Sequence, residues 1–186
     1  MANMASVAYV IEGPQKNLEE ILGAICLAMT DKKHWTEYKA CEHLGFSEQE
    51  LDGKRLGGEI DDDPTLENGV LSFYAEERWG LQDFNELLEQ KFPDIKIYWV
   101  VEESGCEVYA TNDKEGKYFP DRFYVDICID DIYDSEYFTK EESMWKWISE
   151  KTGGKITNME QAEAFVGDED SLYDNFISIH QFSVMD

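Results

Sequence analysis

Apolar and aromatic positions are densest between residues 69 and 113, where two apolar runs flank an amphipathic segment. The first run, residues 69–78, predicts a strand, and apolar positions recur at helical spacing through residues 81–92. Residues 95–102 and 106–111 then predict two strands joined as a hairpin. This strand–helix–hairpin unit contains much of the apolar material needed for a core.

The residues before this unit supply a first strand and helix. Ala5–Ile11 is apolar and partly β-branched, which predicts a strand. Apolar residues then recur at helical spacing from Leu18 to Met29, with Asn17 in the position of an N-cap. Residues 31–53 predict a helical insertion, and Ser47-Glu-Gln-Glu50 within it has the spacing of a capping box.

A weak strand at residues 56–60 completes the order strand, helix, strand, strand, helix, strand. This is the order of a ferredoxin-like α/β sandwich, an antiparallel sheet with helices on one face. We therefore expect an α+β protein whose ferredoxin-like core occupies residues 5–111, with residues 106–111 extending one edge of the sheet.

The pattern changes after residue 111. Residues 123–130 alternate apolar and polar positions, as in a half-buried strand. Capping-box spacings beginning at Thr139 and Thr157 predict two helices, and residues 176–184 predict a last strand. No Pro-, Ser- or Gly-rich linker precedes these elements, so we expect a single domain over 1–186 with an acidic C-terminal extension, 112–186.

The chain is strongly acidic: 41 acidic residues against 16 basic ones give a formal net charge of −25. Residues 1–60 carry a net charge of −4 and residues 61–186 a net charge of −21. Because binding to phosphates or anionic membranes requires clustered Lys and Arg, we expect neither a direct nucleic-acid partner nor a membrane partner. The acidity favours a basic protein partner, and a homo-oligomer is left open.

The cysteines and the opening residues indicate a reducing compartment. Cys26, Cys41, Cys106 and Cys128 have no CxxC spacing, which argues against a zinc site, and we expect them to be reduced and mostly buried. The first residues lack the pattern of a signal peptide, and no apolar run reaches the length of a membrane span. A cytoplasmic protein without a cofactor is the expectation.

A strand that runs into Trp79-Gly80, a helix that ends in Phe92-Pro93, and an aromatic strand with Tyr98 and Glu102-Glu103 occur in series within residues 69–113. This series resembles the ferredoxin-like domain of Api92-like proteins of plasmids and phages. The resemblance covers about a quarter of the chain. It implies the fold and an origin in a mobile element, and it supplies no activity.

Paired acidic residues are the main candidates for acid–base chemistry. Glu76-Glu77 and Glu102-Glu103 are predicted at the ends of neighbouring strands, where an apolar pocket would separate the pKa values of two carboxyl groups. No pocket is visible in the sequence, so we interpret both pairs as polar strand ends. His34, His43 and His180 are not accompanied by a nucleophile motif, and no catalytic residue is expected.

Two further patterns resemble binding motifs without meeting their requirements. Residues 61–63 and 130–134 are rich in Asp but lack the ligand spacing of a calcium loop, so we expect solvated turns and no metal site. Residues 41–51 resemble a helix-turn-helix, but the second helix opens with acidic residues that phosphates would repel.

These observations predict a non-enzymatic protein-interaction module, in one version a DNA mimic whose carboxylates occupy a basic DNA-binding protein. The alternative is a small hydrolase or metal-dependent enzyme with an acidic cleft. Exposed aromatic residues beside carboxylates are typical of protein-binding surfaces. The predicted interaction surface consists of Asp126, Asp130, Asp131, Asp134, Glu136, Tyr133, Tyr137 and Trp145.

Overall fold

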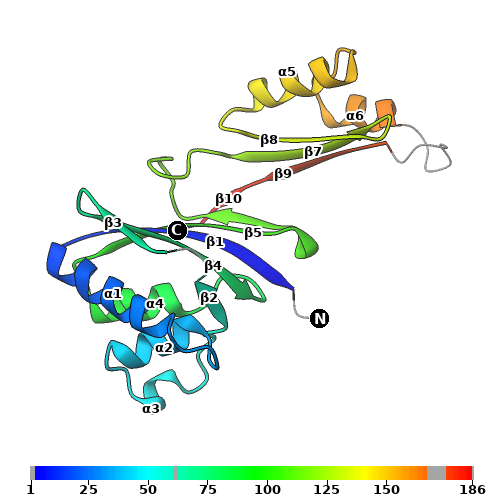
Figure 1. Cartoon of the computed structure of the whole chain (residues 1–186). Helices are drawn as coiled ribbons and strands as arrows, with labels where there is room; N and C mark the ends of the chain where they lie inside the picture. Colours follow the sequence, from blue (N-terminus) through cyan, green and yellow to red (C-terminus); the bar gives the residue numbers. More distant parts are fainter. Residues whose placement is uncertain (1–2, 61–62, 167–174, 186) are drawn as a thin grey trace. The chain divides into compact units, whose positions relative to one another are not determined.

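The computed structural model describes residues 3–60, 63–166 and 175–185. The chain divides into two compact units, residues 1–114 with 185–186 and residues 115–184 (Figure 1). One seven-strand sheet and one three-strand antiparallel sheet combine with six α-helices among the described residues. The expected α+β class is confirmed.

The first unit is built around β1, the strand at the middle of its sheet. β1 pairs antiparallel with β4 on one side and with β5 on the other. β2 and β3 pair with β4, β6 pairs with β5, and the strands within residues 1–114 have the order β6-β5-β1-β4-β2. They are β1 (Met4–Glu12), β2 (Gly58–Ile60), β3 (Thr65–Glu67), β4 (Val70–Arg78), β5 (Lys96–Glu103) and β6 (Val108–Thr111). The seventh strand of the sheet is β10 (Ser183–Val184).

The helices of the first unit lie on one face of this sheet (Figure 1). They are α1 (Gln15–Ala28), α2 (Thr36–His43), α3 (Glu48–Leu51) and α4 (Phe84–Lys91), and a 3₁₀ turn, Ser104–Cys106, joins β5 to β6. Because side chains alternate between the two faces of a strand, every second residue of β1 from Ala5 to Ile11 is buried beneath the helices. The buried stripes of α1 and α4 complete this core.

The second unit has a core of its own. Its sheet has the order β8-β7-β9, with strands β7 (Phe123–Ile129), β8 (Ile132–Phe138) and β9 (Phe176–Gln181). Helices α5 (Glu141–Thr152) and α6 (Met159–Val166) cover one face (Figure 1). Val125 and Ile127 of β7 pack there against Met144 and Ile148 of α5.

Several predicted elements are present with shifted ends. The strands expected at 69–78 and 95–102, their intervening helix and the hairpin to 106–111 are confirmed, as is the capping box at Ser47. The predicted N-cap at Asn17 is wrong. Helix α1 begins at Gln15 after Pro14, and the Asn17 amide already donates to the Pro14 carbonyl at 2.9 Å.

The two other predicted capping boxes are also wrong by one residue each. Lys140, rather than Thr139, precedes α5, and its side chain makes no capping hydrogen bond. At α6 the Asn158 side chain, rather than Thr157, accepts the Gln161 amide at 3.0 Å.

The acidic stretch between residues 130 and 142 contains a strand, β8, that the sequence did not predict. Most residues of β8 are exposed, so the apolar alternation that marks a half-buried strand is missing. The short strand β3 is likewise absent from the elements that the sequence predicts. The division between Lys114 and Glu115 falls beside the expected start of the extension, and a single domain over 1–186 stays a prediction.

All four cysteines are free. Cys41 and Cys128 are buried as expected, but Cys26 and Cys106 are exposed, which corrects the expectation that they are mostly buried. None of the helices that the structure describes is both long and apolar enough to span a membrane.

Candidate functional site

The predicted interaction residues all lie in the second unit, most of them on the hairpin of β7 and β8, residues 123–138, which we term the acidic hairpin. Asp126, Tyr133 and Tyr137 lie on the face of the sheet opposite to α5, because their strand positions alternate with the buried Val125 and Ile127. Tyr133 is 72% exposed.

The turn of the acidic hairpin consists of Asp130 and Asp131. Both have positive φ, 50° and 64°, the left-handed conformation that a two-residue hairpin loop requires and that Asp tolerates better than most residues. The Asp130 amide donates to the Asn175 side chain at 2.9 Å. Two exposed carboxylates are thereby held at the tip of the hairpin, next to Ile132, which is 70% exposed.

Asp134 and Glu136 lie on the α5 side of β8, which is an edge strand of its sheet. Asp134 forms an ion pair with Lys151 of α5, and this hydrogen bond holds the pKa of its carboxyl group below the ordinary range. The Asp134 carboxylate also accepts the Ser135 amide at 3.0 Å, and the Glu136 carboxylate accepts the Tyr137 amide at 3.1 Å. The amides of Ser135 and Tyr137 in this edge strand therefore already donate to side-chain carboxylates, which discourages the pairing of a further strand with β8.

The face of the sheet around Asp126 is aromatic. The centroid of the Tyr124 ring lies 4.8 Å from the centroid of the Tyr137 ring and 5.9 Å from the centroid of the His180 imidazole. His180 Nε2 is 3.2 Å from Asp126 Oδ1, which forms a carboxylate–imidazole pair. A hollow of 250 Å³ adjoins these residues, and its lining consists of Tyr124, Asp126, Ile127, Tyr133, Asp134, Ser135 and Phe176.

Trp145, the remaining predicted residue, lies on α5 and not on the hairpin. Its indole Nε1 donates to Glu141 at 3.0 Å, and its ring packs partly against the core of the second unit. The eight residues therefore divide among two faces of a sheet, a turn and a helix. The structure brings Asp126, Tyr133 and Tyr137 onto one face.

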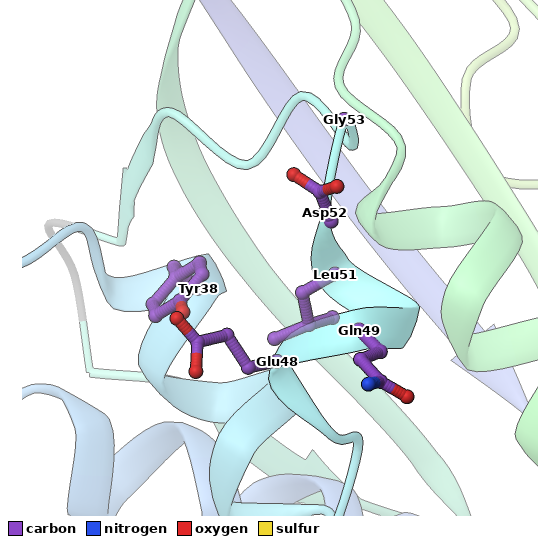
Figure 2. A pocket seen from close by; sticks show the side chains of 6 residues that line it. All are labelled: Tyr38, Glu48, Gln49, Leu51, Asp52 and Gly53. Carbon is purple, nitrogen blue, oxygen red and sulfur yellow. The ribbon is translucent and has the colours of Figure 1, made fainter.

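A second hollow lies in the first unit, where the sequence predicted only a capped helix. It has a volume of 420 Å³, and Figure 2 shows Tyr38 of α2 facing it together with residues of α3 and the following turn. The lining combines two carboxylates with an aromatic ring, groups that can accept an ammonium or guanidinium group. The lining residues are Tyr38, Glu48, Gln49, Leu51, Asp52 and Gly53.

The third feature is a pair of fully buried carboxyl groups in the first unit, Glu37 of α2 and Glu77 of β4. The two carboxyl groups lie close enough for each to influence the pKa of the other. Glu77 Oε1 accepts the Tyr9 hydroxyl at 2.5 Å, and its Oε2 accepts the Gln82 amide at 2.5 Å. Glu37 Oε2 accepts the Gly58 amide at 3.0 Å.

Burial dominates the acid–base behaviour of this carboxyl pair. Desolvation, and then the charge of Glu77, raise the pKa of Glu37 well above its ordinary value of 4.5. Desolvation also raises the pKa of Glu77, although its hydrogen bonds oppose the shift. The pKa of Tyr9 is raised well above 10.0, chiefly by burial, so its hydroxyl remains a donor.

The structure corrects the predicted arrangement of paired carboxylates. β4 and β5 are not neighbours, because β1 lies between them, so Glu76-Glu77 and Glu102-Glu103 do not adjoin. Glu76 accepts the Ser6 hydroxyl at 2.7 Å, while Glu77 interacts with the carboxyl group of Glu37. The proximity of Glu37 to Glu77 could not be predicted from the sequence, because Glu37 belongs to the helical insertion and its burial depends on the tertiary fold.

No group of three or more His, Cys, Asp or Glu side chains is arranged to hold a metal ion in the described part of the chain, and Asp61 and Asp62 lie outside that part. The chain matches no family model, no curated protein and no solved structure.

Proposed function

We propose that this protein is a non-enzymatic interaction module that binds a basic protein partner through the acidic hairpin. The observation that carries the proposal is the hairpin itself, which combines carboxylates with exposed apolar and aromatic side chains. Asp130, Asp131 and Glu136 are exposed there, beside Ile132 and Tyr133. Large anchors surrounded by charge are typical of binding surfaces, and carboxylates select basic partners.

The edge-strand hydrogen bonds favour recognition by side chains. Because the amides of Ser135 and Tyr137 already donate to neighbouring carboxylates, an added strand would compete with existing bonds. The partner then contacts carboxylates and rings rather than the main chain. In the DNA-mimic version of the proposal, these carboxylates replace phosphates on the surface of a DNA-binding protein.

The experiment compares two variants with equal loss of charge. The hairpin variant is D130N/D131N/D134N/E136Q, and the control is E19Q/E20Q/E67Q/D94N, whose four sites are exposed in the first unit. Affinity for protamine, an arginine-rich peptide, is measured by calorimetry at 50 mM and 300 mM salt. We expect the hairpin variant to bind at least about tenfold more weakly at low salt and the control to change by less than about twofold.

Equal losses in the two variants would contradict the proposal, because they would show that only total charge matters. Displacement of duplex DNA from protamine tests the mimic version with the same variants. There the unmodified protein and the control displace DNA, and the hairpin variant does so only at a higher concentration.

The proposed fold within the first unit is ferredoxin-like, as in the Api92-like proteins, with a mobile-element origin. Support comes from the all-antiparallel order β5-β1-β4-β2 and from the position of α1 and α4 between strands that they connect on one face of the sheet. A hydrolase is the second candidate, favoured by the Asp126–His180 pair beside Ser135.

The hydrolase has its own test. A pair that activates a nucleophile would give turnover of p-nitrophenyl esters that is lost in H180Q and retained in H43Q. We expect no turnover above the buffer rate in any of the three proteins. Turnover that depends on His180 would replace the interaction module by the enzyme.

A further inference from the structure

Glu37 joins helix α2 to strand β2 through a contact that only glycine permits. A Cβ atom on Gly58 would lie 2.2 to 2.5 Å from the carboxyl atoms of Glu37, closer than any side chain allows. The Gly58 amide donates to Glu37 Oε2 in the same contact. The carboxyl group therefore lies directly on the backbone of β2, inside the protein.

The other oxygen of this carboxyl group, Glu37 Oε1, is buried and accepts no hydrogen bond from any described residue. Its neighbour Glu77 is also an acceptor, and both Glu77 oxygens already accept donors from Tyr9 and Gln82. A proton on one of the two carboxyl groups supplies an O–H that can donate to the other group.

Few charged groups lie close enough to the carboxyl pair to offset a negative charge on it. Tyr9 of β1 is neutral, and Cys41 of α2 has a pKa raised to about 12 by burial and by Glu37. Asp83 adds negative charge near Glu37, and Arg55 adds positive charge near Glu77. Glu59 of β2 accepts the Thr36 amide at the start of α2. The buried residues of α1 and α4 around this core are apolar.

We infer that the Glu37–Glu77 pair is a proton-dependent latch, which holds α2 against β2 and β4 while a proton lies between the two carboxyl groups. Loss of that proton to solvent leaves two buried negative charges that repel each other. Movement of α2 away from the sheet relieves the repulsion and exposes both groups to water. The latch belongs to the first unit and is independent of the acidic hairpin.

The direction of the pH effect follows from linkage. The folded protein binds the pair's protons more tightly than the unfolded chain does, so the contribution of the pair to stability is complete below pH 4.5. It is lost as pH rises through the raised pKa of the folded state. Alkaline conditions open the latch, and acidic conditions close it.

Cys41 provides a local readout, because it is a buried thiol on α2 itself. A maleimide is added to the full-length protein between pH 6 and pH 9, and the labelled peptides are identified by mass spectrometry. Cys128, a buried thiol of the second unit, is the reference. Between pH 6 and pH 9 we expect the labelling rate of Cys41 to increase by a factor at least about ten times larger than that of Cys128.

The variant E37Q carries a permanent amide donor where the latch needs a proton, and E42Q changes an exposed position of the same helix. We expect E37Q to keep Cys41 protected at pH 9 and E42Q to behave like the unmodified protein. Equal pH dependence of Cys41 and Cys128 in the unmodified protein would overturn the inference, whether or not E37Q folds. So would a folded E37Q in which Cys41 labelling still follows the unmodified protein.

Discussion

At the scale of single residues, the two proposals depend on carboxyl groups in opposite environments. Glu37 and Glu77 are fully buried, and desolvation raises their pKa values. Asp134 lies at the surface, and its hydrogen bond with Lys151 lowers its pKa. The same side-chain chemistry thus favours a bound proton in the first unit and a negative charge in the second.

The absence of a side chain at Gly58 makes room for the buried carboxyl group of Glu37, and replacement of Gly58 gives a direct prediction. In Gly58→Ala the added methyl group collides with the Glu37 carboxyl group, so we expect a loss of about 1–3 kcal/mol in the free energy of unfolding. Urea denaturation measures it. Gly23→Ala in α1 is the matched control, because its Cβ meets nothing within 4 Å, and a helical alanine there should stabilise by about 0.5–1 kcal/mol. A Gly58→Ala protein as stable as the unmodified one would contradict the described contact.

The carboxyl pair also predicts how stability depends on pH. We expect the free energy of unfolding to fall as pH rises above 4.5, because the folded state holds the extra proton, and we expect Glu37→Gln to flatten this dependence. Urea denaturation at several pH values, with Glu42→Gln as control, measures the slope. A slope that Glu37→Gln leaves unchanged would show that other groups cause it.

At the scale of elements, the sequence predicts best where burial imposes a period. Strand β1 and helix α4 follow from their apolar spacing. Strand β8 does not, because exposure on both faces removes the alternation. The Glu37–Glu77 pair could not be predicted, because only the tertiary fold brings α2 and β4 together.

Helix caps give a prediction at this scale. In Ser47→Ala the capping box of α3 is lost, and we expect the protein to be destabilised by about 1 kcal/mol. In Thr139→Ala no capping bond is lost, so the change should remain within about 0.5 kcal/mol. Thermal or urea denaturation compares the two, and equal effects would contradict the assignment of Lys140 as the N-cap of α5.

At the scale of the whole molecule, the net charge of −25 does not by itself identify a binding surface. Both units contain more acidic than basic residues, so a basic molecule is attracted to either one. What distinguishes the acidic hairpin is the combination of exposed carboxylates with Ile132 and Tyr133. The proposal therefore requires that binding be local.

Mapping the bound surface tests this requirement most directly. Backbone amide resonances of the isotope-labelled protein are followed by NMR while protamine is added at 150 mM salt, where long-range attraction is screened. We predict that the shifts concentrate at residues 123–138 and are largest near Asp130, Asp131 and Tyr133. Shifts of similar size at exposed acidic residues of both units would contradict a dedicated binding surface.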